Sequence, residues 1–91
     1  MIRRSNLEYS TKVDIPRRII HSCSKALKET FQYILEGYLH KSFRVTVKCF
    51  LKTSTCRITV IFNERPAHPE AIDELVAKVA DRTVKTVRQA C

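Results

Sequence analysis

The sequence has few of the residues that bend or interrupt a chain. Its 91 residues include one glycine, three prolines and no tryptophan. Glycine and proline mark most turns and loops, so their scarcity predicts long regular elements joined by short connections. An apolar content of 44% is enough to build one hydrophobic core. We therefore expect residues 1–91 to form a single folded domain.

The sequence also lacks an apolar run of about 20 residues, the length that crosses a membrane. The N-terminal residues carry the positive charge of a secretory leader, but the apolar stretch that has to follow is missing. We expect a cytoplasmic protein with no membrane partner. Its four cysteines should then be reduced thiols, at positions Cys23, Cys49, Cys56 and Cys91.

No motif for a catalytic, metal or cofactor site is present. Structural zinc sites usually take ligands in pairs with about two to four residues between them, a spacing that the cysteines and histidines do not show. His21 and Cys23 lie two positions apart on a predicted helix and face different directions, so they do not form a nucleophile–base pair. We predict no enzyme activity, no metal, no cofactor and no small-molecule substrate.

The clearest periodic pattern predicts a helix over residues 15–39. Asp14 can cap its start, Pro16 is tolerated in the first turn, and Gly37 weakens its end. A second helix is predicted over residues 69–89, with acidic residues at its start and basic residues near its end. The apolar side chains of the first helix recur at steps of three and four residues: Ile19, Ile20, Cys23, Ala26, Leu27, Phe31, Ile34, Leu35 and Tyr38.

Two segments, 43–52 and 56–62, alternate apolar and polar residues and predict a β-hairpin. The turn between them has no glycine, so its type does not fix the register. Cys56 can face either Leu51 or Cys49, because both pairings keep the apolar faces together. In the pairing with Cys49, oxidation in vitro could join the two cysteines.

The N-terminal stretch 1–13 is either a disordered arm or, over residues 7–13, an edge strand. The hairpin 43–62 alone is a poor platform for two long helices, so we favour the strand. The order is then β-α-β-β-α, an α+β fold that corresponds to a ferredoxin-like unit lacking its last strand. We expect an antiparallel sheet with 56–62 in the centre and both helices on one face.

Positive charge is concentrated in particular segments. The formal net charge is +8, yet residues 63–91 are balanced, while residues 43–62 carry four cations and no acid. This distribution indicates an anionic partner more than a need for solubility.

The outward positions of the hairpin combine cations with an aromatic side chain: Arg44, Thr46, Lys48, Phe50, Lys52, Arg57, Thr59 and Ile61. Cations attract phosphates, and an unpaired base can stack on Phe50, which suits RNA or single-stranded DNA. The alternative is an ordinary solvent-facing surface on which Phe50 and Ile61 form the contact of a homodimer.

A second basic cluster consists of Arg3, Arg4, Arg17 and Arg18. Arg17 and Arg18 fall at the start of the predicted helix, where cations oppose the helix dipole, so a bound anion would explain them. The alternative is local neutralisation by Asp14 or Glu8. The sequence thus favours a small non-enzymatic accessory or regulatory protein that binds DNA or RNA. The alternative is a homodimeric protein-interaction module with no nucleic-acid role.

Overall fold

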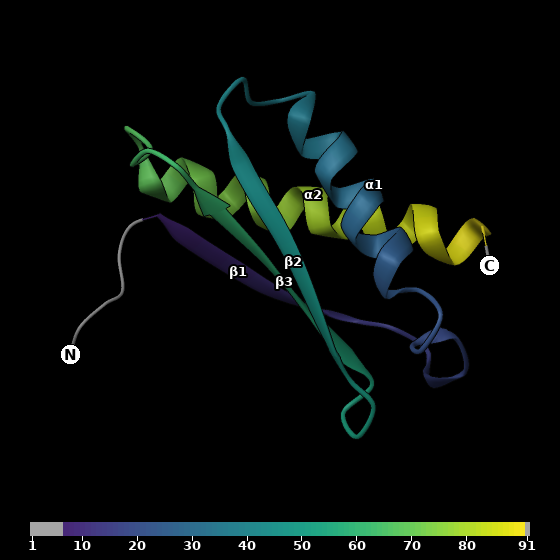
Figure 1. Ribbon diagram of the computed structural model, residues 1–91. Helices are drawn as coiled ribbons and strands as arrows, with labels where there is room; N and C mark the ends of the chain where they lie inside the picture. Colours follow the sequence, from purple (N-terminus) through teal and green to yellow (C-terminus); the bar gives the residue numbers. More distant parts are fainter. Residues whose placement is uncertain (1–6, 91) are drawn as a thin grey trace.

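A three-stranded sheet covered on one side by two helices makes up the computed structural model (Figure 1). The structure describes residues 7–90, so Arg3 and Arg4 of the predicted binding residues lie outside it. The elements in chain order are β1 (Glu8–Asp14), the 3-10 helix η1 (Arg17–Ile19), α1 (Ser24–Glu36), β2 (Phe43–Phe50), β3 (Thr55–Phe62) and α2 (Pro69–Ala90). This order confirms the predicted β-α-β-β-α fold, and no helix of the described chain is long and apolar enough to cross a membrane.

The sheet is antiparallel with the strand order β1-β3-β2, which confirms β3 as the central strand. β1 is the predicted edge strand, shifted by one residue to Glu8–Asp14. The hairpin adopts one of the two registers left open by the sequence, with Cys49 opposite Cys56. Leu51 begins the turn instead of pairing with Cys56.

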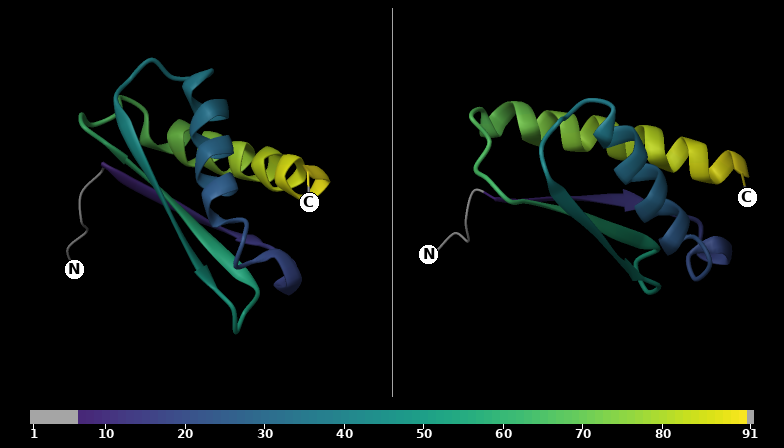
Figure 2. Two further views of the ribbon diagram at one scale, coloured as in Figure 1. Left: turned by 45° about the vertical axis from the view of Figure 1, so that its right-hand side comes forward. Right: turned by 45° about the horizontal axis from the view of Figure 1, so that its top comes forward.

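The core lies between the sheet and the helices. Figure 2 shows from two further directions that α1 and α2 cover the same face of the sheet. Phe62 of β3 packs edge-on against Tyr9 of β1 and Phe43 of β2, with ring centroids 5.6 and 6.0 Å apart, so aromatic contacts join all three strands. The helices contribute buried side chains at helical spacing: Leu27, Phe31 and Leu35 from α1, and Ile72, Val76, Val79, Ala80, Thr83 and Val87 from α2.

The first predicted helix is wrong over residues 15–23. Ile15 lies outside any helix, where its backbone N–H donates to the Ser54 carbonyl at 3.0 Å and its own carbonyl accepts from the Ser54 hydroxyl. Pro16 also disfavours helical backbone in the residue before it. Pro16 follows with ψ of 137°, outside the helical region, and only η1 forms before a turn at Ser22. Asp14 therefore ends β1 and does not cap a helix.

The remaining helix boundaries are closer to prediction. α1 ends at Glu36, three residues before the expected end at residue 39, and Gly37 is its C-cap. α2 confirms the second predicted helix and extends it by one residue, to Ala90.

Two of the predicted thiols form a disulfide, which corrects the prediction of reduced cysteines. Cys49 of β2 and Cys56 of β3 stand directly opposite each other with Cα atoms 4.0 Å apart, and their sulfurs are bonded. Cys23 keeps its thiol, which is buried in the core and donates to the Ile20 carbonyl. The pairing follows from the hairpin register, which the sequence did not decide.

Candidate nucleic-acid interface

The face of the sheet that points away from the helices carries the predicted hairpin residues. Successive strand residues point to opposite faces, so burial of Val45 and Ile58 against the helices turns their neighbours outward. Arg44, Lys48 and Arg57 are exposed on this open face. Phe50, Thr59 and Ile61 share the face and are partly covered, while Thr46 is exposed. The structure thus brings the predicted strand residues onto one surface.

Three cations form a row across this surface. The register places Lys12 of β1 opposite Arg57 of β3, and Arg57 opposite Lys48 of β2. Because neighbouring strands lie about 4.8 Å apart, the row spans about 10 Å and crosses all three strands. All three side chains are exposed. We call Lys12, Arg57 and Lys48 the cation row.

Lys12 was missed by reasoning from the sequence. The apolar residues Leu7, Tyr9 and Val13 fall at alternate positions of the stretch 7–13, and this pattern already assigns Lys12 to the opposite face. Tyr9 and Val13 are buried against the helices, and only the pairing of β1 with β3 shows that Lys12 lies beside Arg57.

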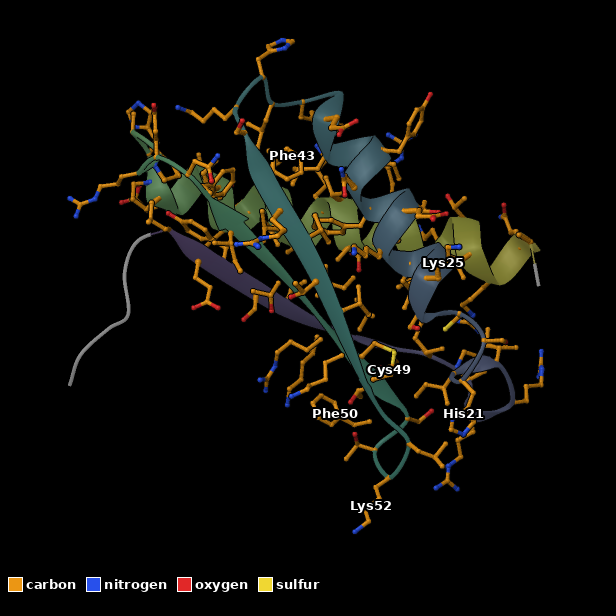
Figure 3. The ribbon with its side chains drawn as sticks, viewed as in Figure 1. His21, Lys25, Phe43, Cys49, Phe50 and Lys52 are labelled. Carbon is orange, nitrogen blue, oxygen red and sulfur yellow. A yellow bond between two sulfur atoms is a disulfide. The ribbon has the colours of Figure 1, made fainter. Side chains whose placement is uncertain are left out.

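Phe50 contacts Arg57, the central residue of the cation row. The Arg57 guanidinium carbon lies 5.8 Å from the centroid of the Phe50 ring, within the range of a cation–π contact. Figure 3 shows Phe50 beside Cys49 toward the hairpin end of the sheet, with Lys52 at the tip of the turn. The aromatic ring therefore contacts one cation of the row at the hairpin end of the sheet.

Charge is divided unequally between the two layers. The helices are balanced: α1 carries two cations and two acids, and α2 carries four of each. The positive excess of the described chain lies in the strands and their connections. The acids of the open face, Glu8 and Asp14, occupy the first and last positions of β1. The strands therefore hold four cations against these two acids, and the other unbalanced cations lie in η1 and the connections: Arg17, Arg18, Lys41 and Lys52.

The second predicted cluster is only partly assembled. Arg17 lies against the hairpin turn, where its Nε donates to the Leu51 carbonyl at 3.3 Å, and Lys52 is exposed in the same turn. Arg18 is exposed in η1. Because η1 has only three residues, the predicted anion site at the start of a long helix is not formed. Arg17 and Lys52 instead extend the positive charge to the end of the hairpin.

The two apolar residues of the open face are far apart. Phe50 stands opposite Thr55, whereas Ile61 stands opposite Arg44 near the other end of β3. Thr55 and Ile61 are six residues apart along one strand, which corresponds to about 20 Å. Phe50 and Ile61 therefore do not form one continuous apolar patch, and the cation row lies between them.

Among residues 7–90, no group of three or more His, Cys, Asp and Glu side chains is arranged to hold a metal ion. Comparison of the chain with protein-family models, curated proteins and solved structures finds no match. The chemistry of the open face is therefore the basis on which a function can be inferred.

Proposed function

We propose that this protein is a small non-enzymatic accessory or regulatory protein that binds DNA or RNA through the open face of its sheet. The cation row carries the proposal. Like charges directly opposite each other on neighbouring strands repel, at a cost of about 0.2–1 kcal/mol per pair. The row contains two such pairs, Lys12 with Arg57 and Arg57 with Lys48. A polyanion laid across the row offsets this repulsion and gains a phosphate contact from each side chain.

The uneven distribution of charge supports the same proposal. Helices with equal numbers of acids and cations do not attract a polyanion strongly, whereas the cationic sheet face does. Arg44 and Lys52 extend this face along the hairpin, on either side of the row. The contacts that we propose are therefore made by Arg44, Lys48, Lys52, Arg57 and Lys12.

A homodimer packed through the open face is the alternative interpretation. Phe50 and Ile61 are partly covered apolar side chains, as such an interface requires. However, two copies stacked through this face would bring two cation rows together, and their apolar residues lie at opposite ends. These features favour a nucleic-acid ligand over a second copy of the chain.

Neutralising the cation row tests the proposal. We expect the triple variant Lys12→Gln, Lys48→Gln and Arg57→Gln to bind labelled oligonucleotides more weakly than the wild type. Each lost phosphate contact lowers the slope of log affinity against log salt by about 0.7 for a single strand, so the slope should fall by about 2. Fluorescence anisotropy at several salt concentrations measures both quantities.

A matched control removes the same charge from the helix layer. Lys25, Lys28 and Lys78 are exposed on α1 and α2, and their triple change to Gln should leave most of the affinity and the slope. Equal losses in the two triple variants, or unchanged binding by the cation-row variant, would contradict the proposal. Light scattering after size exclusion tests the alternative, since a dimer that binds no oligonucleotide would support it.

A further inference from the structure

One aromatic side chain stands on the open face of the described strands. Phe50 is half-buried there, while the other outward positions of β1, β2 and β3 hold charged, hydroxyl or aliphatic side chains. It is two residues from Lys48 on the same strand, or about 7 Å along the face. A nucleotide whose phosphate contacts the cation row can therefore reach Phe50 with its base.

The contact with Arg57 prepares this ring for stacking. The Arg57 guanidinium carbon lies 5.8 Å from the ring centroid, so the planar guanidinium offers a second flat surface beside the ring, while its N–H groups remain suited to phosphate oxygens. Bases stack on aromatic rings and on arginine planes irrespective of their identity. The Phe50–Arg57 pair thus combines a stacking surface with a phosphate contact.

A disulfide and several hydrogen bonds hold the backbone beneath this pair. Phe50 directly follows Cys49, and Arg57 directly follows Cys56, so the disulfide joins the two strands immediately beside the stacking surface. The adjoining turn is tied back to the chain after β1 by the bond from Ile15 N–H to the Ser54 carbonyl and by the bond from Arg17 to the Leu51 carbonyl. A surface fixed in advance loses less conformational freedom when a ligand binds.

A double helix does not offer an unpaired base that could stack on Phe50. Its bases are stacked on one another and present only their edges in the grooves, which proteins read with an inserted helix or β-ribbon. Both helices lie on the far side of the sheet (Figure 2), and the hairpin turn is anchored to the chain after β1. A duplex would contact the phosphate-binding cations and leave Phe50 without a partner.

We infer that the ligand is a single-stranded nucleic acid that crosses the cation row and stacks one unpaired base on the Phe50–Arg57 pair. This inference rests on the proposed function. It assigns separate roles to neighbouring residues: Lys12 and Lys48 contact phosphates, Phe50 contacts a base, and Arg57 contacts both.

A double-mutant cycle between Phe50 and the base tests this inference. The probes are labelled homopyrimidine RNA and DNA strands, and strands of the same length in which every nucleotide is abasic. We expect Phe50→Ala to weaken binding of the normal strands about tenfold, the effect of losing one stacked base. The abasic strands should bind wild type and variant equally, because they retain only the phosphates.

Two further variants make the result interpretable. Arg57→Lys keeps the charge but removes the flat guanidinium, so it should weaken the normal strands more than the abasic strands. Tyr33→Ala is the matched control, because Tyr33 is 79% exposed on α1 in the helix layer, and should have no effect. Thermal melts identify any variant that fails to fold, and Arg57→Lys then provides the test on a folded protein.

The possible outcomes separate the inference from the proposed function. The inference is supported if Phe50→Ala binds the normal strands more weakly than the wild type does and binds the abasic strands equally well. The wild type should then also bind a duplex no better than it binds the abasic strand. Equal binding of normal and abasic strands, or preference for the duplex, overturns it and leaves the proposed phosphate contacts intact. No binding of any probe overturns both.

Discussion

Lys12 and Lys48 each stand opposite Arg57, and removing both should make the protein more stable. The double variant Lys12→Thr and Lys48→Thr eliminates both repulsive pairs and leaves the contact between Arg57 and Phe50 in place. At about 0.2–1 kcal/mol per pair, the expected gain in the free energy of unfolding is about 1 kcal/mol. For a domain of this size, that gain raises Tm by about 4–8 °C.

Salt concentration distinguishes charge repulsion from other sources of stability. The side chains are exposed, so their repulsion is strong in low salt and largely screened at about 1 M, where the Debye length is about 3 Å. Thermal melts followed by circular dichroism should therefore show the gain at low salt and little of it at high salt. The same variant should bind oligonucleotides more weakly, since the stabilising change removes two proposed phosphate contacts.

Arg44→Thr is the matched control for the preference of threonine for strands. Arg44 lies on the same face of β2 but opposite Ile61, so its replacement relieves no directly opposed charge. A gain in stability from Arg44→Thr as large as the gain per substitution in the double variant would refute the reasoning. So would a double variant no more stable than wild type at low salt, or a gain that persists undiminished in high salt.

Three other predictions concern the fold. Reducing the Cys49–Cys56 disulfide, which spans seven positions, should lower the free energy of unfolding by about 2–3 kcal/mol, and an unchanged urea midpoint in dithiothreitol would contradict this. Phe31→Ala should cost about 3–5 kcal/mol in urea denaturation because Phe31 is fully buried, whereas Tyr33→Ala on the same helix should change stability by less than about 0.5 kcal/mol. The amides through which β1 pairs with β3 should resist hydrogen exchange, and deleting the chain through β1 should cause unfolding or aggregation by exposing the edge of β3. A folded, monomeric truncation would refute the last prediction.

The sequence predicted the order of elements because each element has a local pattern. Alternation with period two marks β2 and β3, and apolar residues at three- and four-residue steps mark α1 and α2. The need for a third strand to support two helices correctly indicated β1. These conclusions depend on neighbouring residues and on how much surface a small sheet must cover.

The start of the first helix was decided by tertiary contacts. Ile15, Ile19 and Ile20 extend the helical periodicity of α1 backward, although Pro16 disfavours helical backbone at Ile15. In the folded chain, two hydrogen bonds join Ile15 to Ser54, which is 39 residues away. A local pattern cannot report a constraint from so distant a partner.

The sequence alone determined that the hairpin presents Arg44, Lys48 and Arg57 on the face opposite Val45 and Ile58, since alternation fixes the face of each side chain. Only the tertiary structure placed Lys12 beside Arg57 and joined Cys49 to Cys56. Both depend on strand register, which a glycine-free turn and a polar edge strand leave open in the sequence. Register is set by long-range pairing and core packing, so the cation row exists only in the folded protein.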